Sequence, residues 1–170
     1  MARMENLLGA LSLTMSDRLR AVGAGHGMST SEQAALVTLL SHPDCAVSWL
    51  GEVLGLTSSG VTRLVDRLVE RGWVSRTPGA DARQRRLRLT SSGTKRAQVL
   101  LRERDATLAE AVDSLGAADR DEFEGLLSRI VGSLAENYVP ALRTCRLCDV
   151  DVCNSAGEEC PLHHTVPTDA

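Results

Sequence analysis

Two short apolar patterns, separated by a turn, limit the folds that this chain can adopt. Residues 47–54 carry apolar side chains at helical spacing, and residues 55–57 interrupt them with a glycine. From Ser58 onward, apolar residues recur at positions i, i+3, i+4 and i+7, as expected for a helix with one buried face. Two short helices joined by about three residues predict a helix-turn-helix.

A predicted β-hairpin comes directly after these helices. Gly72 stands where a left-handed residue commonly ends a helix, and residues 73–77 have the composition of a short strand. Residues 78–82 are rich in turn formers, and residues 85–90 alternate outward arginines with inward leucines. A helix-turn-helix followed by a basic hairpin predicts a winged helix.

Amphipathic helices are also predicted on both sides of the winged helix. Residues 4–22 place apolar side chains at helical spacing, and so do residues 123–134, where Asp119 and Glu122 suggest a capping box. Residues 4–22 and 118–138 together present more apolar surface than one small winged helix covers. Symmetric pairing of two chains is the commonest way to bury such a surface, so we expect a dimer.

The expected fold is mainly α with a small β-hairpin wing: a winged helix-turn-helix with long dimerisation helices. Aromatic residues are scarce, so leucine, valine and alanine must build the core, which favours helices. A helix beginning near Ser29 or Thr30, with Glu32 or Gln33 closing a capping box, is expected to open the winged helix. The expected segments are an N-terminal dimerisation helix (1–28), a winged helix-turn-helix (29–90), C-terminal dimerisation helices that end at Pro140 (91–139) and a cysteine-rich tail (140–170).

Basic residues are concentrated in the winged helix. Residues 57–96 hold ten Lys or Arg and three Asp or Glu, whereas the rest of the chain holds nine basic and nineteen acidic residues. A basic region in an acidic chain favours binding to a polyanion, although a solvated charged face has the same composition. Hydroxyl groups at a helix N-terminus can bind phosphates, and arginine can bind guanine bidentately. The DNA-binding candidates are Ser58, Ser59, Thr62, Arg63 and Arg67 on the second helix and Arg83, Arg85 and Arg86 at the wing, with Asp81 positioned to orient an arginine.

These elements resemble the winged helix of MarR-type transcriptional regulators. The stretch GVTRLVDRLVERGWVSR is followed by DARQRRLRLTSSG, which matches the family's Asp-x-Arg at the wing, alternating strand ending in Leu-Thr and glycine-containing cap. The resemblance covers roughly residues 5–138 and implies an obligate homodimer whose two winged helices read a near-palindromic operator. It implies major-groove contacts by Ser58, Ser59, Thr62, Arg63 and Arg67, wing contacts by Arg83 and Arg85, and an orienting role for Asp81.

The expected function is therefore sequence-specific binding to double-stranded DNA, as a repressor. The sequence contains no recognisable nucleophile–base pairing or phosphate-binding glycine loop, which argues against an enzyme. No apolar run approaches the roughly 20 residues that span a bilayer, and the N-terminus lacks a signal-peptide pattern, so we expect a cytoplasmic protein. A metal carrier or electron-transfer protein that uses the winged helix for docking is the rival hypothesis, and the arginine-rich wing argues against it.

The C-terminal tail departs from the family pattern because it holds four of the five cysteines. Thiols this dense in a reducing compartment predict metal ligation before disulfides. A run of cysteines that closes on Cys-Pro favours an iron–sulfur cluster, whereas structural zinc usually takes two Cys-x2-Cys pairs and only one is present. A thiol–disulfide switch or an unliganded tail are further alternatives. The predicted ligands are Cys145, Cys148, Cys153 and Cys160.

The remaining cysteine and the histidines give weaker indications of function. Cys45 is expected to be an inert core residue, and His26 and His42 to be surface or capping residues. His163 and His164 are kept as reserve ligands. Family members commonly bind small lipophilic anions between the dimer helices and the winged helix, and the tail puts such an effector in doubt. A cluster at the end of a dimer helix could set the spacing of the two wings, so that oxidation, iron shortage or nitric oxide would change operator affinity.

Overall fold

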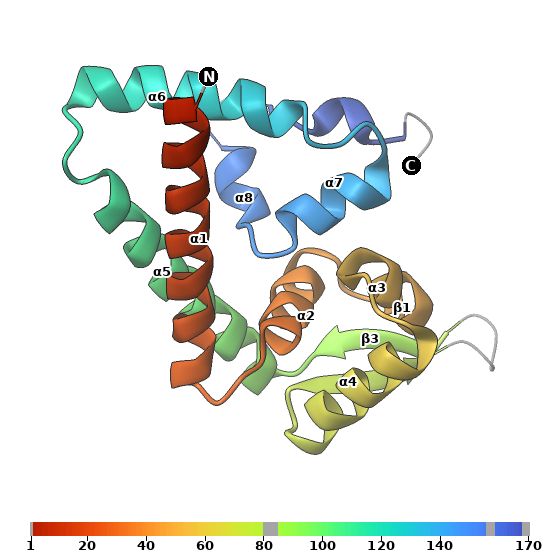
Figure 1. Ribbon diagram of the computed structural model, residues 1–170. Coiled ribbons are helices and arrows are strands. Elements are labelled where there is room, and N and C mark those ends of the chain that lie inside the picture. The colour runs from red at the N-terminus through yellow and green to blue at the C-terminus, as the bar shows by residue number, and fades with distance from the viewer. Residues whose placement is uncertain (1, 80–84, 156–158, 168–170) are drawn as a thin grey trace.

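The computed structural model describes residues 2–79, 85–155 and 159–167. The chain forms a winged helix, long helices that precede and follow it in the sequence, and a folded C-terminal segment of shorter helices (Figure 1). Within the described residues, no helix is both long enough and apolar enough to cross a membrane. The elements in chain order are α1 (Ala2–Gly25), α2 (Thr30–Ser41), β1 (Cys45–Ala46), α3 (Val47–Leu54), α4 (Ser58–Glu70), β2 (Val74–Pro78), β3 (Arg85–Leu89), α5 (Ser91–Val112), α6 (Ala117–Gly132), α7 (Tyr138–Cys145), α8 (Val150–Cys153) and the 3-10 turn η1 (His163–Thr165).

The predicted fold class is confirmed: the chain is mainly helical with one small antiparallel sheet. The sheet has strand order β1-β3-β2, so β3 pairs with β2 in the hairpin and with β1 on its other side. Cys45 in β1 faces Leu87 in β3. The sequence did not reveal β1, because two residues are too few to show an alternating pattern.

The core of the winged helix forms where α2, α3 and α4 meet the sheet. The apolar stripe of α4 is buried as predicted, and Leu64 and Leu68 in it are almost fully enclosed. Burying one such side chain contributes about 1.5–3 kcal/mol, which makes this stripe a main determinant of where α4 lies. The remaining fully buried large side chains are Leu36, Leu39, Leu50, Val53, Val61, Val65 and Leu87.

Glycine is required by the backbone at two positions, one before and one after the wing hairpin. Gly72 has φ +68, so the predicted left-handed residue at the end of α4 is confirmed. Gly93, in the first turn of α5, packs so closely on the wing that a Cβ there would lie 2.0 Å from the carbonyl oxygen of Trp73. Any larger residue at position 93 would separate α5 from the sheet.

The helix starts agree only in part with the predicted capping residues. The box of Ser29 and Glu32 at the start of α2 is confirmed. The predicted box of Asp119 and Glu122 is wrong, because α6 begins at Ala117 with Gly116 as its cap and Asp119 lies inside the first turn. A carboxylate there still interacts favourably with the positive end of the helix dipole.

The end of the last helix was also predicted wrongly. Helix α6 ends at Gly132, and Pro140 lies in the first turn of an additional helix, α7, where a missing N–H costs nothing. Residues after α6 form a small second core in which Ala135, Ala141 and Leu162 are buried. In Figure 1, α7 and α8 lie between α6 and the winged helix.

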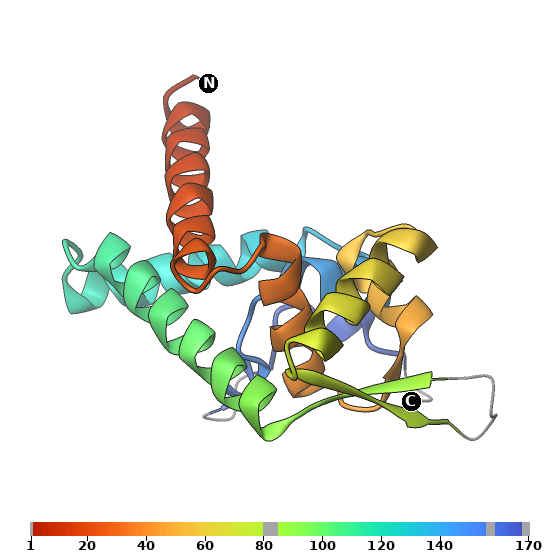
Figure 2. The same ribbon diagram turned by 90° about the horizontal axis from the view of Figure 1, so that it is seen from below.

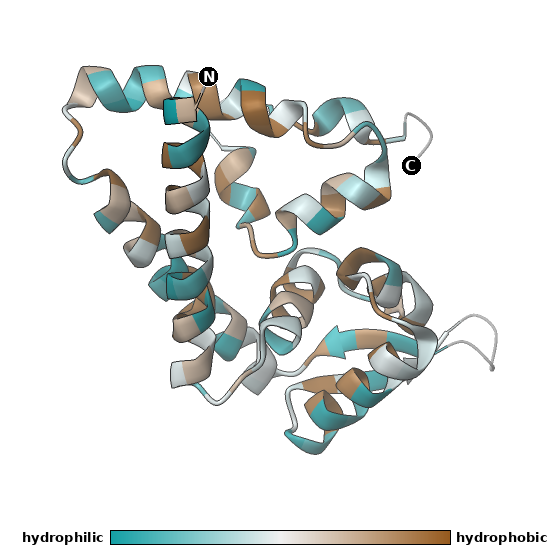
Figure 3. Cartoon of the chain, viewed as in Figure 1, coloured by the Kyte–Doolittle hydropathy of each residue, from teal (hydrophilic) through white to brown (hydrophobic). Residues whose placement is uncertain are grey.

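Apolar side chains on α1 and α6 remain exposed in the single chain. Figure 3 shows hydrophobic bands along both helices, and Figure 2 shows α1 standing away from the rest of the molecule. Leu8 on α1 is 52 % exposed and Ile130 on α6 is 47 % exposed. The other large exposed apolar side chains of the two helices and the turn after α6 are Met4, Leu7, Leu11, Leu13, Leu126, Leu127 and Leu134.

Candidate nucleic-acid interface and cysteine pocket

The N-terminal half of α4 presents the predicted small polar residues to solvent. Thr57 caps the helix, and its hydroxyl oxygen accepts a hydrogen bond from the Gly60 amide at 3.2 Å. Ser58, Ser59 and Thr62 are exposed. Arg63 is exposed too, and its Nε donates to the Ser59 carbonyl at 3.3 Å, which leaves the end of the guanidinium directed away from the core. These four side chains form one polar face at the positive end of the helix.

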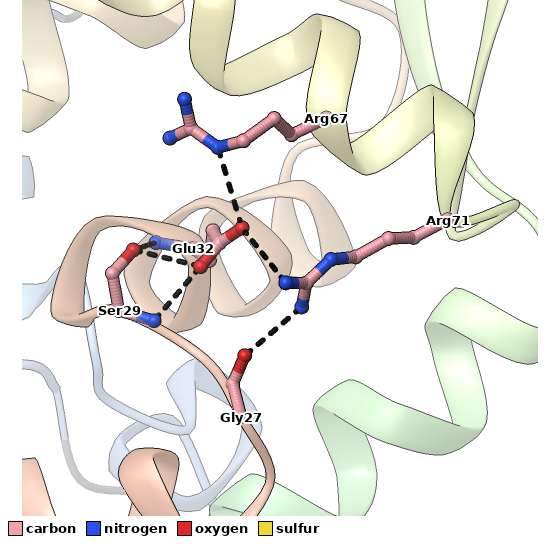
Figure 4. Close-up of polar contacts among 5 residues, drawn as sticks. All are labelled: Gly27, Ser29, Glu32, Arg67 and Arg71. Atoms are coloured by element: carbon pink, nitrogen blue, oxygen red, sulfur yellow. Dashed lines mark hydrogen bonds and ion pairs between the residues drawn. The ribbon is translucent and has the colours of Figure 1, made fainter.

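Arg67, the fifth candidate on α4, is tied to the neighbouring helix. Its Nε lies 3.6 Å from Oε1 of Glu32, whose side chain is only 5 % exposed (Figure 4). Nη2 of Arg71 lies 4.0 Å from the same oxygen, and its Nη1 donates a hydrogen bond to the Gly27 carbonyl at 3.0 Å. The pair of arginines therefore joins the far end of α4 to the start of α2 and to the end of the α1–α2 turn.

Glu32 is held in its charged form by this arrangement. Burial raises its pKa, but hydrogen bonds from the Ser29 amide and hydroxyl, both 2.8 Å, and the charges of Arg71 and Arg67 outweigh burial and lower the pKa. Sequence reasoning identified Glu32 only as a capping residue. Its second role was missed because α4 follows about thirty residues later, and only the tertiary structure brings the two arginines to it.

The two candidate arginines in the described part of the wing differ in their exposure to solvent. Arg85 begins β3 and is exposed, as predicted. Arg86 is half-buried, and its Nη1 donates to the Asp44 carbonyl at 3.2 Å, so its predicted position at an outward tip is wrong. Arg86 pairs in register with Ala46 of β1, two residues from Asp44, which brings the Asp44 carbonyl within its reach. The other two wing candidates, Asp81 and Arg83, lie outside the described residues.

Asp44 organises this edge of the sheet and was missed by sequence reasoning. Its backbone has φ +62, which is uncommon for a residue other than glycine. The Asp44 carboxylate accepts a hydrogen bond from Arg88 Nε at 3.0 Å, and this bond, with the charges of Arg88 and Arg86, holds the Asp44 pKa below its usual value. Within the described residues, Asp44 thus orients arginines of β3, the role that the sequence suggested for Asp81.

The four tail cysteines line a single cavity of about 180 Å³. Helix α7 supplies Cys145, the turn after it Cys148, α8 Cys153, and the segment before η1 Cys160. Most of the remaining wall is apolar and comes from Ala141, Leu142, Val150, Leu162 and Val166. Among the described residues, no three His, Cys, Asp or Glu side chains are gathered closely enough to hold one metal ion.

The charges of the thiols depend on one another. The Cys145 thiol is hydrogen-bonded to Cys148, which raises the pKa of Cys145 and lowers that of Cys148. Arg104 on α5 favours the Cys148 thiolate, because its Nη2 lies 3.8 Å from Sγ. Burial and the neighbouring thiols raise the pKa of Cys153. The pocket therefore favours one thiolate at a time, and a thiophilic cation is what would allow several thiolates to coexist there.

The histidines divide into two groups around this pocket. His163 lines it, and so does His42, whose ring packs edge-on against Trp49 at a centroid distance of 5.2 Å. His164 instead has ring nitrogens 3.2 Å from the carbonyl oxygens of Pro161 and Ala135. His42 caps α2, as sequence reasoning allowed, but its place in the cysteine pocket was missed because it is about a hundred residues from the tail.

Cys45 has a different environment. It is half-buried against the winged-helix core, and burial raises the pKa of its thiol to about 11. The thiol is therefore protonated at neutral pH and a poor nucleophile. This supports its interpretation as a packing residue.

Comparison with known proteins points to one family. Residues 26–86 match the model of the MarR family. A MarR family protein from Bacillus stearothermophilus is 27 % identical, with TM-score 0.68, over 76 % of this chain and 91 % of that one. YusO of Bacillus subtilis is 22 % identical, with TM-score 0.69, over 78 % of this chain and 95 % of that one. A search of curated proteins gave no match.

The same fold occurs in MepR, a transcription regulator of the Staphylococcus aureus multidrug efflux pump MepA. MepR is 19 % identical, with TM-score 0.68, over 77 % of this chain and 98 % of that one. The described helix-turn-helix, hairpin and long helical arms, together with the family match, agree with the resemblance drawn from the sequence. Residues 26–86 match the MarR family model, and the chain has the fold of MarR-family winged-helix proteins.

Proposed function

We propose that this protein binds a near-palindromic DNA operator as a homodimer and that its cysteine pocket holds an iron–sulfur cluster that controls the binding. The observation that carries the DNA-binding half of the proposal is the exposed polar face of α4. Ser58, Ser59, Thr62 and Arg63 all point to solvent, whereas the opposite stripe of the helix is buried. A helix with this division of faces can enter a major groove without disturbing the core.

The exposed apolar faces of α1 and α6 support the homodimer. These helices carry side chains as large as leucine and isoleucine that the single chain leaves exposed. A second copy of the chain is a self-complementary partner for such faces. In a two-fold dimer the recognition helices would lie about 34 Å apart, the length of one turn of DNA.

The donor set of the pocket supports an iron–sulfur cluster over zinc. Structural zinc sites usually take two Cys-x2-Cys pairs, whereas this segment has one pair and closes on Cys-Pro, a pattern typical of iron–sulfur ligation. All four cysteines line one cavity of about 180 Å³, so the fold brings the complete donor set to one place. Cys145, Cys148, Cys153 and Cys160 would hold the cluster, which would supply oxidation-sensitive charge in the pocket. Arg104 would then lie beside a negatively charged group rather than a lone thiolate.

The DNA-binding proposal is tested with a duplex selected by the protein from a random pool. Fluorescence anisotropy with this duplex should give one dimer per site and a Kd that weakens steeply as salt increases. Binding that is equally tight for an unrelated duplex would refute sequence-specific recognition. A reporter gene whose promoter contains the selected site should be less active when the protein is present, as expected for a repressor.

The cofactor proposal is tested by anaerobic purification, visible absorption and analysis of iron, sulfide and zinc. We expect a coloured protein with iron and sulfide, and loss of both in Cys148→Ala. A colourless protein with one zinc per chain would replace the cluster by a zinc site and leave the DNA-binding proposal intact. A metal-free protein after anaerobic purification and reconstitution with ferrous iron and sulfide would refute metal binding.

A further inference from the structure

The C-terminal segment makes a direct contact with the helix-turn-helix of its own chain. Arg143, on α7, donates a hydrogen bond from Nη2 to the Glu52 carbonyl at 2.8 Å. The Glu52 carbonyl belongs to the last turn of α3. The negative end of a helix dipole attracts a cation, so the guanidinium is placed where α3 stabilises it electrostatically as well as by hydrogen bonding. Residues 52 and 143 are far apart in sequence, so this contact depends on the fold of the tail.

The contact falls at the turn between the two helices of the helix-turn-helix. Gly55 is left-handed with φ +65, its amide donates to the Glu52 carbonyl at 3.2 Å, and the Leu56 amide donates to the Gly51 carbonyl at 2.9 Å. This is the double hydrogen bond of a glycine-ended helix. A Cβ on Gly55 would lie 3.5 Å from Cζ of Arg143, so the guanidinium covers the turn itself.

The recognition helix begins two residues beyond this turn. Thr57 is the N-cap of α4, and the exposed serines follow it directly. A shift of the turn at Gly55 would therefore move the end of α4 that presents Ser58 and Ser59 to DNA.

The other end of the same path is the cysteine pocket. Arg143 lies two residues before Cys145 on α7, and Leu142 and Cys145 of that helix both line the cavity. A helix moves as a unit over so short a distance because each residue is bonded to the next turn. A change in the pocket that moves Cys145 therefore also moves Arg143.

We propose that Arg143 is the positioning residue through which the occupied or empty state of the cysteine pocket reaches the recognition helix. The proposal deepens the proposed function and rests on its metal site. It locates the coupling within one chain, along α7 and the α3–α4 turn, and it requires no change in the dimer interface. Sites coupled through a protein typically alter each other's affinity about 5- to 150-fold.

The test compares wild type, Arg143→Ala and Arg143→Met, each reconstituted anaerobically with ferrous iron and sulfide or stripped of metal. Methionine keeps the apolar stem of Arg143 on α7 but cannot donate a hydrogen bond. For each form, the Kd for the selected duplex is measured at one salt concentration. We expect wild type to show at least a fivefold difference between loaded and stripped forms, and both variants to show less than a twofold difference. Iron and sulfide content and the visible spectrum should stay as in wild type.

The matched control is Thr144→Ala. Thr144 is exposed on the same helix, and its hydroxyl donates to the Pro140 carbonyl at 3.1 Å within the helix. This variant should keep the wild-type difference in Kd. Hydrogen exchange provides a second measurement: amides of residues 52–57 should exchange at different rates in the loaded and stripped wild type, and at equal rates in the Arg143 variants.

The outcomes separate this inference from the proposed function. If wild type binds DNA and the cluster but its loaded and stripped forms bind DNA equally, control of DNA binding by the cluster is refuted, and so is the role of Arg143. If wild type shows the expected difference in Kd and the Arg143 variants retain it, control by the cluster stands and the role of Arg143 is refuted. Loss of iron and sulfide in the Arg143 variants would also refute it, because the residue would then only maintain the pocket.

Discussion

At the scale of single residues, Glu32 shows how one side chain serves two elements. It closes the capping box of α2 through Ser29 and holds Arg67 and Arg71 of the helix-turn-helix. A buried carboxylate with two cationic neighbours is costly to disturb, because removing its charge leaves two arginines facing a neutral group. Arg67 is therefore both a candidate DNA contact and part of the internal scaffold.

Glu32→Gln should lower the free energy of unfolding at pH 7 by about 1.5–3 kcal/mol, the range for a hydrogen bond to a charged group. Because the folded state lowers the Glu32 pKa, the stabilisation is complete above the ordinary value of 4.5 and is lost as pH falls through the folded-state value. Urea unfolding at pH 7 and at acid pH should therefore show a wild-type advantage that shrinks below about pH 4.5.

The control for this comparison is Glu70→Gln, at an exposed site near the end of α4. We expect a change within about 0.5 kcal/mol, as for most surface substitutions. An equal loss of stability in the two variants would show that the Glu32 carboxylate does not hold the two helices together.

Cys45 and the tail cysteines should differ in reactivity. With the Cys45 pKa raised from 9.0 to about 11, its thiolate fraction at pH 8 is about 100-fold below that of an ordinary thiol. In metal-free protein, mass spectrometry after brief iodoacetamide treatment should find Cys45 unmodified while Cys148, the tail thiol whose pKa is lowered, is labelled. Unfolding in urea should abolish the protection; rapid labelling of Cys45 in folded protein would contradict its assignment to the core.

At the scale of elements, the charged groups of the winged helix are of two kinds: some join its helices and strands to one another, and others are exposed to solvent. Arg76 pairs with Asp66 at 2.5 Å and joins the hairpin to α4, whereas Arg86 and Arg88 hold Asp44. Arg63 and Arg85 are exposed at the two places expected to meet DNA. Substitutions in the two groups should therefore have different consequences, the first for stability and the second for DNA affinity.

Arg85→Ala should weaken binding to the selected duplex and to unrelated duplexes by similar factors. A wing arginine that contacts phosphate releases counterions, so its removal should also reduce the slope of log Kd against log salt by about one. The circular dichroism spectrum and the oligomeric state should not change. Unchanged affinity at moderate salt would remove Arg85 from the interface.

Arg63→Ala should change which DNA sequences the protein prefers. If Arg63 binds a guanine edge, its loss costs about 1–3 kcal/mol at that base pair and relaxes selection there. Repeating the random-pool selection with the variant measures this directly. A variant that weakens all sequences equally would show that Arg63 contacts the backbone instead.

At the scale of the whole molecule, dimerisation should decide whether the protein binds its operator at all. Ile130→Glu places a charge in the exposed apolar face of α6. We expect monomers by light scattering and loss of tight operator binding, because each monomer can occupy only one half-site. Glu124→Gln, on the same helix, is the control and should remain dimeric; a dimeric Ile130→Glu would place the interface elsewhere.

The winged helix could be predicted from the sequence, because local apolar spacing, Gly72 and the alternating hairpin each act over a few residues. The sequence also predicted the buried stripe and exposed face of α4. It was wrong about the capping box at Asp119 and about the end of the last helix, because neither depends on a strong local signal. The metal ligands, their cofactor and the wing residues Asp81 and Arg83 stay predictions.

Contacts between groups that are distant in the sequence could not be predicted and are known from the folded structure. The pairing of Glu32 with Arg67, the turn of Arg86 toward Asp44 and the place of His42 in the cysteine pocket join residues that no periodic pattern connects. The same is true of Arg143 on the α3–α4 turn. The physical reason is that polar contacts over long sequence separations arise after packing has placed the helices, whereas amphipathic helices and turns are encoded in their own residues.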